Sequence, residues 1–352
     1  MKILTIIGAR PQFIKAAVFS KVVKKYNDIE EVIIHTGQHY DKNMSQIFFD
    51  ELDIPKPKYN LHINGGSHAQ QTGRMLIELE KIFLEEKPNF ILVYGDTNST
   101  LAGALAGSKI HIPIIHIEAG FRSHDKEMPE EINRICTDHM SSLLFCPTKE
   151  AVNELKKEGI TQGVHFVGDI MYDAVKDFSN TQTNILEKYS LEKEKYIYCT
   201  IHRAQNTDSK EKLQNIFDAL VKSDEQIIIP LHPRTRKKLE EFKLFSKYEN
   251  KNILFLEPIN YFESLELTKN AKKIVTDSGG VLREAYFLQK TCIVVRDSIE
   301  FVEMIKDEEG ILVGSDKEKI ITAIKEFKAK GEFKNYFGNA TTAKQIVKVL
   351  RR

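Results

Sequence analysis

Short apolar runs rich in β-branched residues recur along the chain, and each is followed by a polar turn and a segment with helical spacing. The first half contains "KILTII", "EVIIHT", "FILVYG", "IPIIHI", "LLFCPT" and "VHFVGD", and the second contains "YIYCTI", "QIIIPL", "NILFLE", "KKIVTD", "TCIVVR" and "GILVG". Apolar strands that alternate with helices are typical of parallel sheets covered on both faces. We therefore predict an α/β fold with two doubly wound, Rossmann-like domains facing a cleft.

The two series of apolar runs are separated by a polar stretch, residues 177–195, which we predict to be a linker. A chain of 352 residues has the length of two ordinary domains. The predicted N-terminal domain covers residues 1–170, and the predicted C-terminal domain covers residues 190–335. The final stretch, "TTAKQIVKVLRR", is predicted to be a helix.

The charge balance argues against polyanionic partners. Lysine and arginine total 51 against 50 acidic residues, so neither nucleic acid nor an anionic membrane surface is expected as a partner. No segment approaches the roughly 20 apolar residues of a spanning helix, and the N-terminus does not resemble a signal peptide. We expect a cytoplasmic protein.

Neither the cysteines nor the histidines predict a metal site. The four cysteines are scattered without a C-x-x-C pair, at Cys136, Cys146, Cys199 and Cys292. His35 and His39 are four residues apart, but "HTGQHYD" leaves a strand through a glycine turn and is not a helix face. We expect no metal and no cofactor.

Two strand ends lead into helix starts that could bind phosphate. In "GARPQFIK", Arg10 stands beside the N–H groups of a helix start. In "TDSGGVLREA", Ser278, Gly279 and Gly280 let a bound group approach the backbone, and Glu284 could accept hydrogen bonds from ribose hydroxyls. Neither stretch is a dinucleotide fingerprint or a Walker loop. The alternatives are a solvated arginine, a simple helix cap and a first-turn acid.

Carboxylates follow two strands of the first domain and begin the next helix. Asp96 follows "LVYG", Glu118 follows "IIHI", and Glu130 and Glu131 follow "MP". Neighbouring strand ends of a parallel sheet lie close together, so Asp96 and Glu118 could share one cavity. Taken singly, Asp96 would be a helix N-cap, and Glu130 and Glu131 would be first-turn acids. Together they predict acid and base chemistry with pKa values adjusted by burial.

Two histidines with adjacent arginines follow strands of the second domain. They are His202 and Arg203 in "CTIHRAQN", and His232 and Arg234 in "PLHPRTR". Each histidine alone could be structural. The two pairs together predict an anionic ligand.

These stretches, in this order, resemble the non-hydrolysing UDP-N-acetylglucosamine 2-epimerase family over essentially the whole chain. The residues that carry the resemblance are "GARPQFIK", "GQHYD", "YGDTNSTLAGALA", "HIEAGFRS", "PEEINR", "TIHRAQN", "LHPRTR" and "TDSGGVLREA". Among the branches of this family, these motifs are most similar to those of the branch that acts on UDP-2,3-diacetamido-2,3-dideoxyglucuronic acid. The resemblance implies a glycosyltransferase-B-like fold in which the C-terminal helix, residues 338–352, rejoins the first domain.

The resemblance also implies a reaction for surface polysaccharide synthesis. UDP is eliminated from the sugar to give a 2-acetamidoglycal and is re-added after C2 is reprotonated on the other face. The catalytic residues implied are Asp96, Glu118, Glu130 and His202. The substrate-binding residues implied are Arg10, Lys15, Arg122, His232, Leu256, Tyr261, Ser278, Gly279, Gly280 and Glu284.

Bacterial non-hydrolysing members bind a second UDP-sugar as an activator, and the family suggests a homodimer. The corresponding allosteric positions are Gln38, His39, Arg74 and Glu131. Three alternatives stay open: a glycosyltransferase of the same fold, a hydrolysing 2-epimerase, and a nucleotide-sugar-binding sensor. The sugar also stays open between N-acetylglucosamine and the diacetamido uronate.

Overall fold

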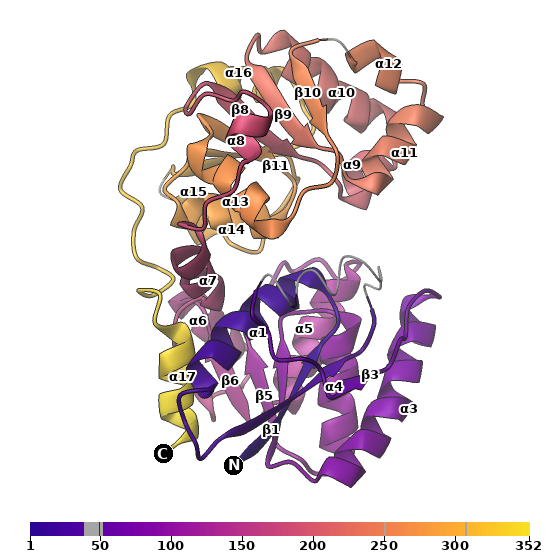
Figure 1. The fold of residues 1–352 in the computed structure, drawn as a ribbon, viewed down its shortest axis with the longest axis vertical. Coiled ribbons are helices and arrows are strands. Elements are labelled where there is room, and N and C mark those ends of the chain that lie inside the picture. Colours follow the sequence, from indigo (N-terminus) through magenta and orange to yellow (C-terminus); the bar gives the residue numbers. More distant parts are fainter. Residues whose placement is uncertain (39–48, 50–51, 250, 307) are drawn as a thin grey trace. The chain divides into compact units, whose positions relative to one another are not determined.

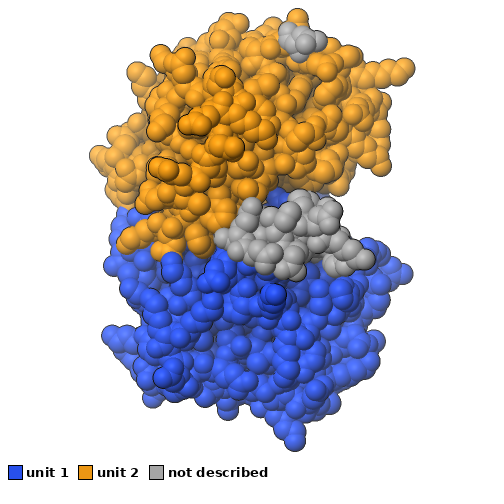
Figure 2. Space-filling view, viewed as in Figure 1, with its two compact units in different colours: residues 1–174, 335–352 blue, residues 175–334 orange. Residues whose placement is uncertain are grey.

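The computed structural model describes residues 1–38, 49, 52–249, 251–306 and 308–352 (Figure 1). The chain divides into two compact units, which Figure 2 shows in different colours. Unit 1 comprises Met1–Ala174 and Asn335–Arg352, and unit 2 comprises Val175–Lys334. The chain leaves unit 1 within helix α7 (Ile170–Phe178), just before the polar stretch expected to be a linker.

Unit 1 is built on a parallel sheet. Its strands are β1 (Lys2–Ile7), β2 (Glu30–His35), β3 (Tyr59–Asn60), β4 (Phe90–Tyr94), β5 (Ile114–Ile117), β6 (Leu143–Cys146) and β7 (Val164–Phe166). Their order is β3-β2-β1-β4-β5-β6-β7, so the direction of winding reverses between β1 and β4. The helices are α1 (Arg10–Val23), α3 (His68–Glu86), α4 (Asn98–Lys109), α5 (Pro129–Met140), α6 (Lys149–Lys157), the first part of α7, and α17 (Thr342–Leu350). Helix α4 packs against α3 and α5, and α1 packs against α17.

Unit 2 repeats this plan. Its strands are β8 (Tyr196–Thr200), β9 (Gln226–Pro230), β10 (Ile253–Leu256), β11 (Lys273–Thr276), β12 (Cys292–Val294) and β13 (Gly310–Leu312). Their order is β10-β9-β8-β11-β12-β13, with the reversal between β8 and β11. The helices are α8 (Ile185–Lys188), α9 (Ala204–Thr207), α10 (Lys210–Lys222), α11 (Pro233–Glu241), α12 (Phe245–Tyr248), α13 (Tyr261–Asn270), α14 (Gly279–Phe287), α15 (Glu303–Lys306) and α16 (Lys317–Glu326).

The two doubly wound sheets confirm the predicted fold class. Each apolar run singled out in the sequence contains a strand, and the inner strands of both sheets are buried because helices cover both faces, whereas the edge strand β7 is not. Strand β3 was not predicted, since it has two residues and neither is fully buried. The polar stretch contains the short helix α8. Within the described ranges, no helix is both long enough and apolar enough to cross a bilayer.

Helix α17 is capped by a residue far away in the sequence. The carboxylate of Asp173, on α7, accepts hydrogen bonds from the backbone N–H groups of Thr342 and Ala343, each at 3.0 Å. Thr341 occupies the N-cap position but makes no side-chain cap bond. Asp173 therefore satisfies the free donors at the start of α17 and ties this helix to unit 1.

Replacing Asp173 with alanine should destabilise the protein by about 1–2 kcal/mol, the usual effect of losing a helix cap. Thr341→Ala is the matched control, because its side chain does not cap the helix, and it should have a smaller effect. Chemical unfolding gives the free energies, and hydrogen exchange of the α17 amides shows whether the helix itself is loosened. Equal losses in the two variants would contradict the assignment of the cap.

Candidate functional site

The reversal of winding marks one edge of each sheet as a binding edge. Ligands of open α/β sheets bind beyond the carboxyl ends of the strands, where the strand order reverses. In unit 1 this edge carries the residues that follow β1, β4 and β5, and in unit 2 it carries those that follow β8 and β11. The predicted acids and His202 belong to these segments, and His232 follows the neighbouring strand β9.

Glu118 and Lys15 form a buried ion pair in unit 1. Glu118 directly follows β5 and is 5% exposed, and Lys15, on α1, is 3% exposed. The backbone of Glu118 is in the left-handed region at φ 72°, which turns the chain sharply at the strand end. A Cβ atom at Gly95 would lie 3.0 Å from Oε2 of Glu118 and 3.4 Å from Nζ of Lys15. The turn after β4 thus needs a glycine to approach this pair.

Asp96 is held by an arginine of helix α5. Nη2 of Arg134 lies 2.5 Å from Oδ2 of Asp96, and its Nη1 lies 2.8 Å from Oε2 of Glu131. Glu131 also accepts hydrogen bonds from the backbone N–H groups of Ser123 and His124, both at 2.9 Å. Burial raises the pKa of Glu131, but these hydrogen bonds and the Arg134 guanidinium outweigh it and lower the pKa overall. Arg134 therefore holds two carboxylates, and one of them, Glu131, in turn holds the 123–124 turn.

The structure corrects the reading of Asp96 as a helix cap. The N-cap of α4 is Thr97, whose side chain accepts from the N–H of Thr100. The side chain of Asp96 is 32% exposed and so remains accessible at the strand end. Glu130 is exposed on the first turn of α5, whereas the neighbouring Glu131 is buried.

Two backbone N–H groups just before helix α1 are already bonded within the turn after β1. The N–H groups of Gly8 and Ala9 donate to Oε1 of Gln12, at 2.8 and 3.0 Å, so they are already bonded within unit 1. A Cβ at Gly8 would lie 2.1 Å from Oγ1 of Thr36, so the close packing of this turn requires glycine. Arg10 is exposed at the first position of α1, and its role as a phosphate ligand stays a prediction.

In unit 2, Asp277 organises the turn that carries His202. Asp277 is fully buried, and its carboxylate accepts from the N–H groups of His202, at 3.0 Å, and Arg203, at 3.0 Å. Nδ2 of Asn206 donates to the same carboxylate at 3.0 Å. The imidazole of His202 is 36% exposed, and its ring centroid lies 5.3 Å from that of His232. The two predicted histidines are therefore neighbours.

The start of helix α14 is surrounded by cationic side chains. Ser278 is its N-cap and accepts from the N–H of Val281 at 3.4 Å. A Cβ atom at Gly279 would lie 3.9 Å from Nη2 of Arg203 and 4.0 Å from Nη1 of Arg296. The helix N-terminus and the two guanidinium groups, which also pair with Glu300, favour an anion. This geometry supports the predicted phosphate site at residues 278–280.

Of the other predicted residues of unit 2, His232 is exposed, and three are buried: Leu256, Tyr261 and Glu284. Burial raises the pKa of Glu284 to about 7 and also raises the pKa of Tyr261 far above its usual value. Leu256 ends β10 as a core residue, and its carbonyl accepts from the N–H of Leu231 at 2.9 Å. His232 caps α11 through Nδ1, so its other ring nitrogen faces away from the cap.

Two of the predicted allosteric residues, Gln38 and Arg74, make contacts within unit 1. Oε1 of Gln38 accepts from the N–H of Ser99, at 3.0 Å, and from its hydroxyl, at 2.7 Å, which joins the turn after β2 to α4. Arg74 is exposed and donates to the carbonyls of Asn64 and Gly65. His39 lies outside the described residues.

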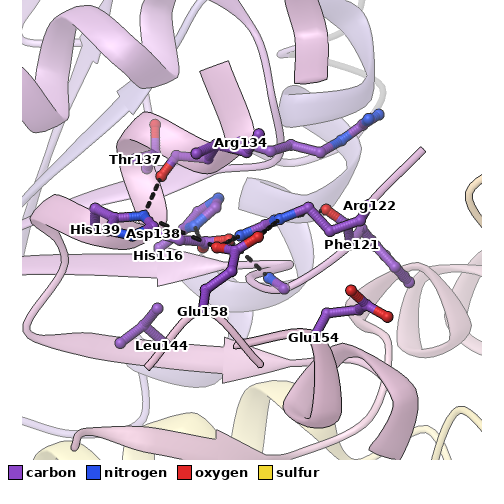
Figure 3. Close-up of polar contacts among 12 residues, drawn as sticks. His116, Phe121, Arg122, Arg134, Thr137, Asp138, His139, Leu144, Glu154 and Glu158 are labelled. Atoms are coloured by element: carbon purple, nitrogen blue, oxygen red, sulfur yellow. Dashed lines mark hydrogen bonds and ion pairs between the residues drawn. The ribbon is translucent and has the colours of Figure 1, made fainter. Parts of the chain in front are cut away.

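Arg122 has contacts that the sequence did not predict. Its side chain is 1% exposed and lies within unit 1, where it binds both oxygens of Glu158 at 2.7 Å and Oδ2 of Asp138 at 2.8 Å (Figure 3). Nη1 also donates to the carbonyl of Phe121. The predicted contact of Arg122 with substrate stays a prediction, and these contacts favour a role in positioning the loop after β5.

Two other site residues were missed as functional candidates. Arg134 holds Asp96, and Nδ2 of Asn133 donates to the backbone carbonyl of Asp96 at 2.9 Å. A sequence signal for Arg134 exists, because it follows Glu131 by three residues and i, i+3 charges of opposite sign meet on a helix. For Asn133 no such signal exists, since its partner lies 37 residues away.

A family model, two relatives and a solved structure that this chain matches all carry the names of UDP-sugar 2-epimerases. The sequence model of a family described as UDP-N-acetylglucosamine 2-epimerase matches residues 21–351. A protein of Methanococcus maripaludis described as a UDP-N-acetylglucosamine 2-epimerase homolog is 55% identical over 100% of this chain and 99% of its own length. The UDP-2,3-diacetamido-2,3-dideoxy-D-glucuronate 2-epimerase of Pseudomonas aeruginosa is 49% identical over 91% of this chain and 90% of its own. The crystal structure of Methanocaldococcus jannaschii UDP-GlcNAc 2-epimerase in complex with UDP-GlcNAc and UDP has a TM-score of 0.93 and 46% identity, covering 100% of this chain and 99% of that one.

Proposed function

Because this chain belongs to the UDP-N-acetylglucosamine 2-epimerase family, we propose that it inverts C2 of a UDP-2-acetamido sugar. A base removes the C2 proton, and its C–H electron pair forms the C1–C2 double bond as UDP leaves. UDP then adds back to C1 of the glycal while a proton is delivered to the opposite face of C2. The reaction needs a carboxylate base, a proton donor and a well-bound diphosphate leaving group.

The observation that carries this proposal is the placement of two carboxylates at adjacent strand ends. Glu118 follows β5, and Asp96 follows β4 directly after Gly95, whose Cβ position lies 3.0 Å from the Glu118 carboxylate. Each acid is held by its own cation, Lys15 for Glu118 and Arg134 for Asp96. Both therefore serve as bases or as stabilisers of positive charge at C1, and the returning proton comes from Glu130 or His202.

Unit 2 binds the UDP portion in this proposal. Residues 278–280, with Arg203 and Arg296 nearby, bind the diphosphate, and Glu284 binds the ribose. Arg10 contributes a further cation. The uracil contacts the backbone near Leu256 and Tyr261, since both side chains are buried. A second UDP-sugar acting at Gln38, His39, Arg74 and Glu131 as an activator, and a homodimer, belong to the same proposal.

The sugar and the reaction are tested together by proton NMR in deuterium oxide. The protein is incubated separately with UDP-N-acetylglucosamine and with the UDP-2,3-diacetamido uronate, since relatives carry the names of both activities. We expect a 2-epimer with deuterium at C2, formed far faster from one sugar than from the other. Protium retained at C2 would reject the elimination mechanism. Release of free sugar would indicate a hydrolase, and no reaction with either sugar would reject the proposal.

UDP affinity should rise with pH as Glu284 ionises. The pKa of this carboxyl is raised to about 7, so it is largely protonated at pH 6 and largely ionised at pH 8. Charged acceptors bind hydroxyl donors more strongly than neutral ones, so the affinity should increase by up to about 10-fold between these pH values. Calorimetry at both pH values measures the change in affinity. The Glu284→Gln variant should lose the part of the pH dependence that comes from Glu284.

The phosphate groups of UDP also titrate in this range, so the comparison between variants decides the outcome. Glu211→Gln, an exposed acid on α10, is the control and should behave like the unchanged protein. If Glu284→Gln keeps the full pH dependence, Glu284 does not contact the ribose as a carboxylate.

A further inference from the structure

Asp138, on helix α5, binds the segment that carries Glu118 from both sides of that residue. Its Oδ1 lies 2.7 Å from Nδ1 of His116, two residues before Glu118. Its Oδ2 accepts from the N–H of Gly120 at 3.1 Å and lies 2.8 Å from Nη1 of Arg122 (Figure 3). Asp138 therefore holds the strand end and the following turn at three points around the catalytic acid.

His116 extends these contacts to the turn that carries Asp96. Its Nε2 lies 2.8 Å from the carbonyl oxygen of Gly95, the residue before Asp96. The side chain of His116 is 0% exposed, so water does not replace either partner. One imidazole thus connects the two turns that present the acids of unit 1.

The hydrogen-bond partners of His116 determine its protons. A peptide carbonyl can only accept a hydrogen bond, so Nε2, facing Gly95, must carry a proton. Oδ1 of Asp138 is an acceptor when the carboxyl is ionised. Although burial raises the pKa of Asp138, the pKa is lowered overall, and the Arg122 guanidinium and the N–H of Gly120 both favour the ionised carboxylate independently of His116. Nδ1 of His116 must then carry a proton as well.

We propose that His116 is a buried imidazolium that acts as a positioning residue, fixing the turn of Asp96 relative to the turn of Glu118. The positioning role rests on the proposed function, whereas the charge on His116 stands independently of it. Hydrogen bonds from a charged donor are roughly twice as strong as neutral ones, so the link to the Gly95 carbonyl is strongest when both nitrogens are protonated.

With Asp138 ionised, the charged groups around His116 balance only if His116 is cationic. Helix α5 contributes Asp138, the loop after β5 contributes Arg122, and Glu158 follows helix α6. Strand β6 contributes Cys146, whose pKa is raised by burial, so the thiol is neutral. Two carboxylates then face one guanidinium and one imidazole. A neutral His116 would leave an uncompensated negative charge in a cluster whose inner members are fully buried, which is strongly unfavourable.

The Asp138→Asn variant separates the charge from the hydrogen bonds. The amide nitrogen of asparagine can donate to Nδ1 of His116 while its oxygen accepts from Gly120 and Arg122, so every contact keeps a partner. His116 then becomes neutral, with its proton on Nε2, and Arg122 and Glu158 still balance each other. The variant should therefore fold, which circular dichroism and thermal unfolding can verify.

The first readout is nitrogen NMR of histidine-labelled protein without substrate. In the unchanged protein, both ring nitrogens of His116 should give signals of the protonated type, and in Asp138→Asn one of them should become unprotonated. His139→Asn is the matched control, because His139 is about half exposed on the same helix and lies 3.9 Å from Glu158. It should remove one histidine signal and leave the signals of His116 unchanged. An unprotonated ring nitrogen on His116 in the unchanged protein would overturn the proposal.

The second readout is the rate. Asp138→Asn should lower kcat by about 10- to 100-fold, the scale expected from a misplaced catalytic group, with little change in KM. His139→Asn should keep both constants. An unchanged kcat in Asp138→Asn would overturn the positioning role even if His116 is charged. If the unchanged protein has no epimerase activity, the proposed function fails, and the NMR result still decides the charge.

Discussion

Replacing Glu118 with glutamine is expected to lower kcat by about 10²–10⁴-fold, the usual effect of removing a general acid or base. Glutamine keeps the shape of the side chain but cannot take a proton from C2 or stabilise positive charge at C1. Glu118 directly follows β5, is 5% exposed and pairs with Lys15, so its position is fixed by the fold before any substrate binds. Steady-state rates with the better of the two UDP-sugars measure the effect.

The same substitution should also destabilise the protein, and the two effects can be separated. Glu118→Gln leaves the buried ammonium of Lys15 without its carboxylate, which costs about 3–5 kcal/mol when a buried pair is broken on one side. In the double variant Lys15→Met, Glu118→Gln, no buried charge remains, so stability should recover while the rate stays low. If the double variant recovered both the stability and the rate, Glu118 would affect the rate only by stabilising the fold. Glu78→Gln is the control, because this acid on α3 is about half exposed and makes only a surface ion pair with Lys81, and it should change neither stability nor rate.

Acid is expected to weaken the native state through His35, by about 3 kcal/mol between pH 7 and pH 4. His35 ends β2, is 1% exposed and stacks on Phe13 with ring centroids 5.2 Å apart. Burial lowers its pKa from 6.5 to about 4. Between these values the unfolded chain binds a proton that the folded protein does not, so stability falls as the pH falls through this window.

The His35→Phe variant tests this contribution. Phenylalanine keeps an aromatic ring against Phe13 and cannot titrate, so its free energy of unfolding should depend less on pH than that of the unchanged protein. Other groups titrate in the same range, and the quantity to measure is therefore the difference between the two proteins at pH 7, 5 and 4. His139→Asn, at an exposed position, should run parallel to the unchanged protein. Parallel curves for His35→Phe would contradict the assigned pKa.

The sequence alone predicted the family and, apart from β3, the described strands of both sheets. Runs such as "FILVYG" and "KKIVTD" are apolar because helices cover both faces of their strands, and this burial is a local property that the residue pattern records. The same pattern placed Asp96, Glu118 and residues 278–280 at strand ends, since a polar residue directly after a buried strand must lie at the edge of the sheet. The family followed from the order of these short stretches.

Only the tertiary structure decided which charges meet. Lys15 pairs with Glu118 across 103 positions of the chain, and Asp173 caps a helix that begins 169 positions later. Arg122 resembled a substrate ligand in the sequence, yet its guanidinium is buried against Asp138 and Glu158. An ionisable side chain can pair with any opposite charge within a few ångströms, and that distance depends on how separate elements pack. Residue type and local spacing therefore predicted where polar groups gather, whereas packing selected their partners and the protons they carry.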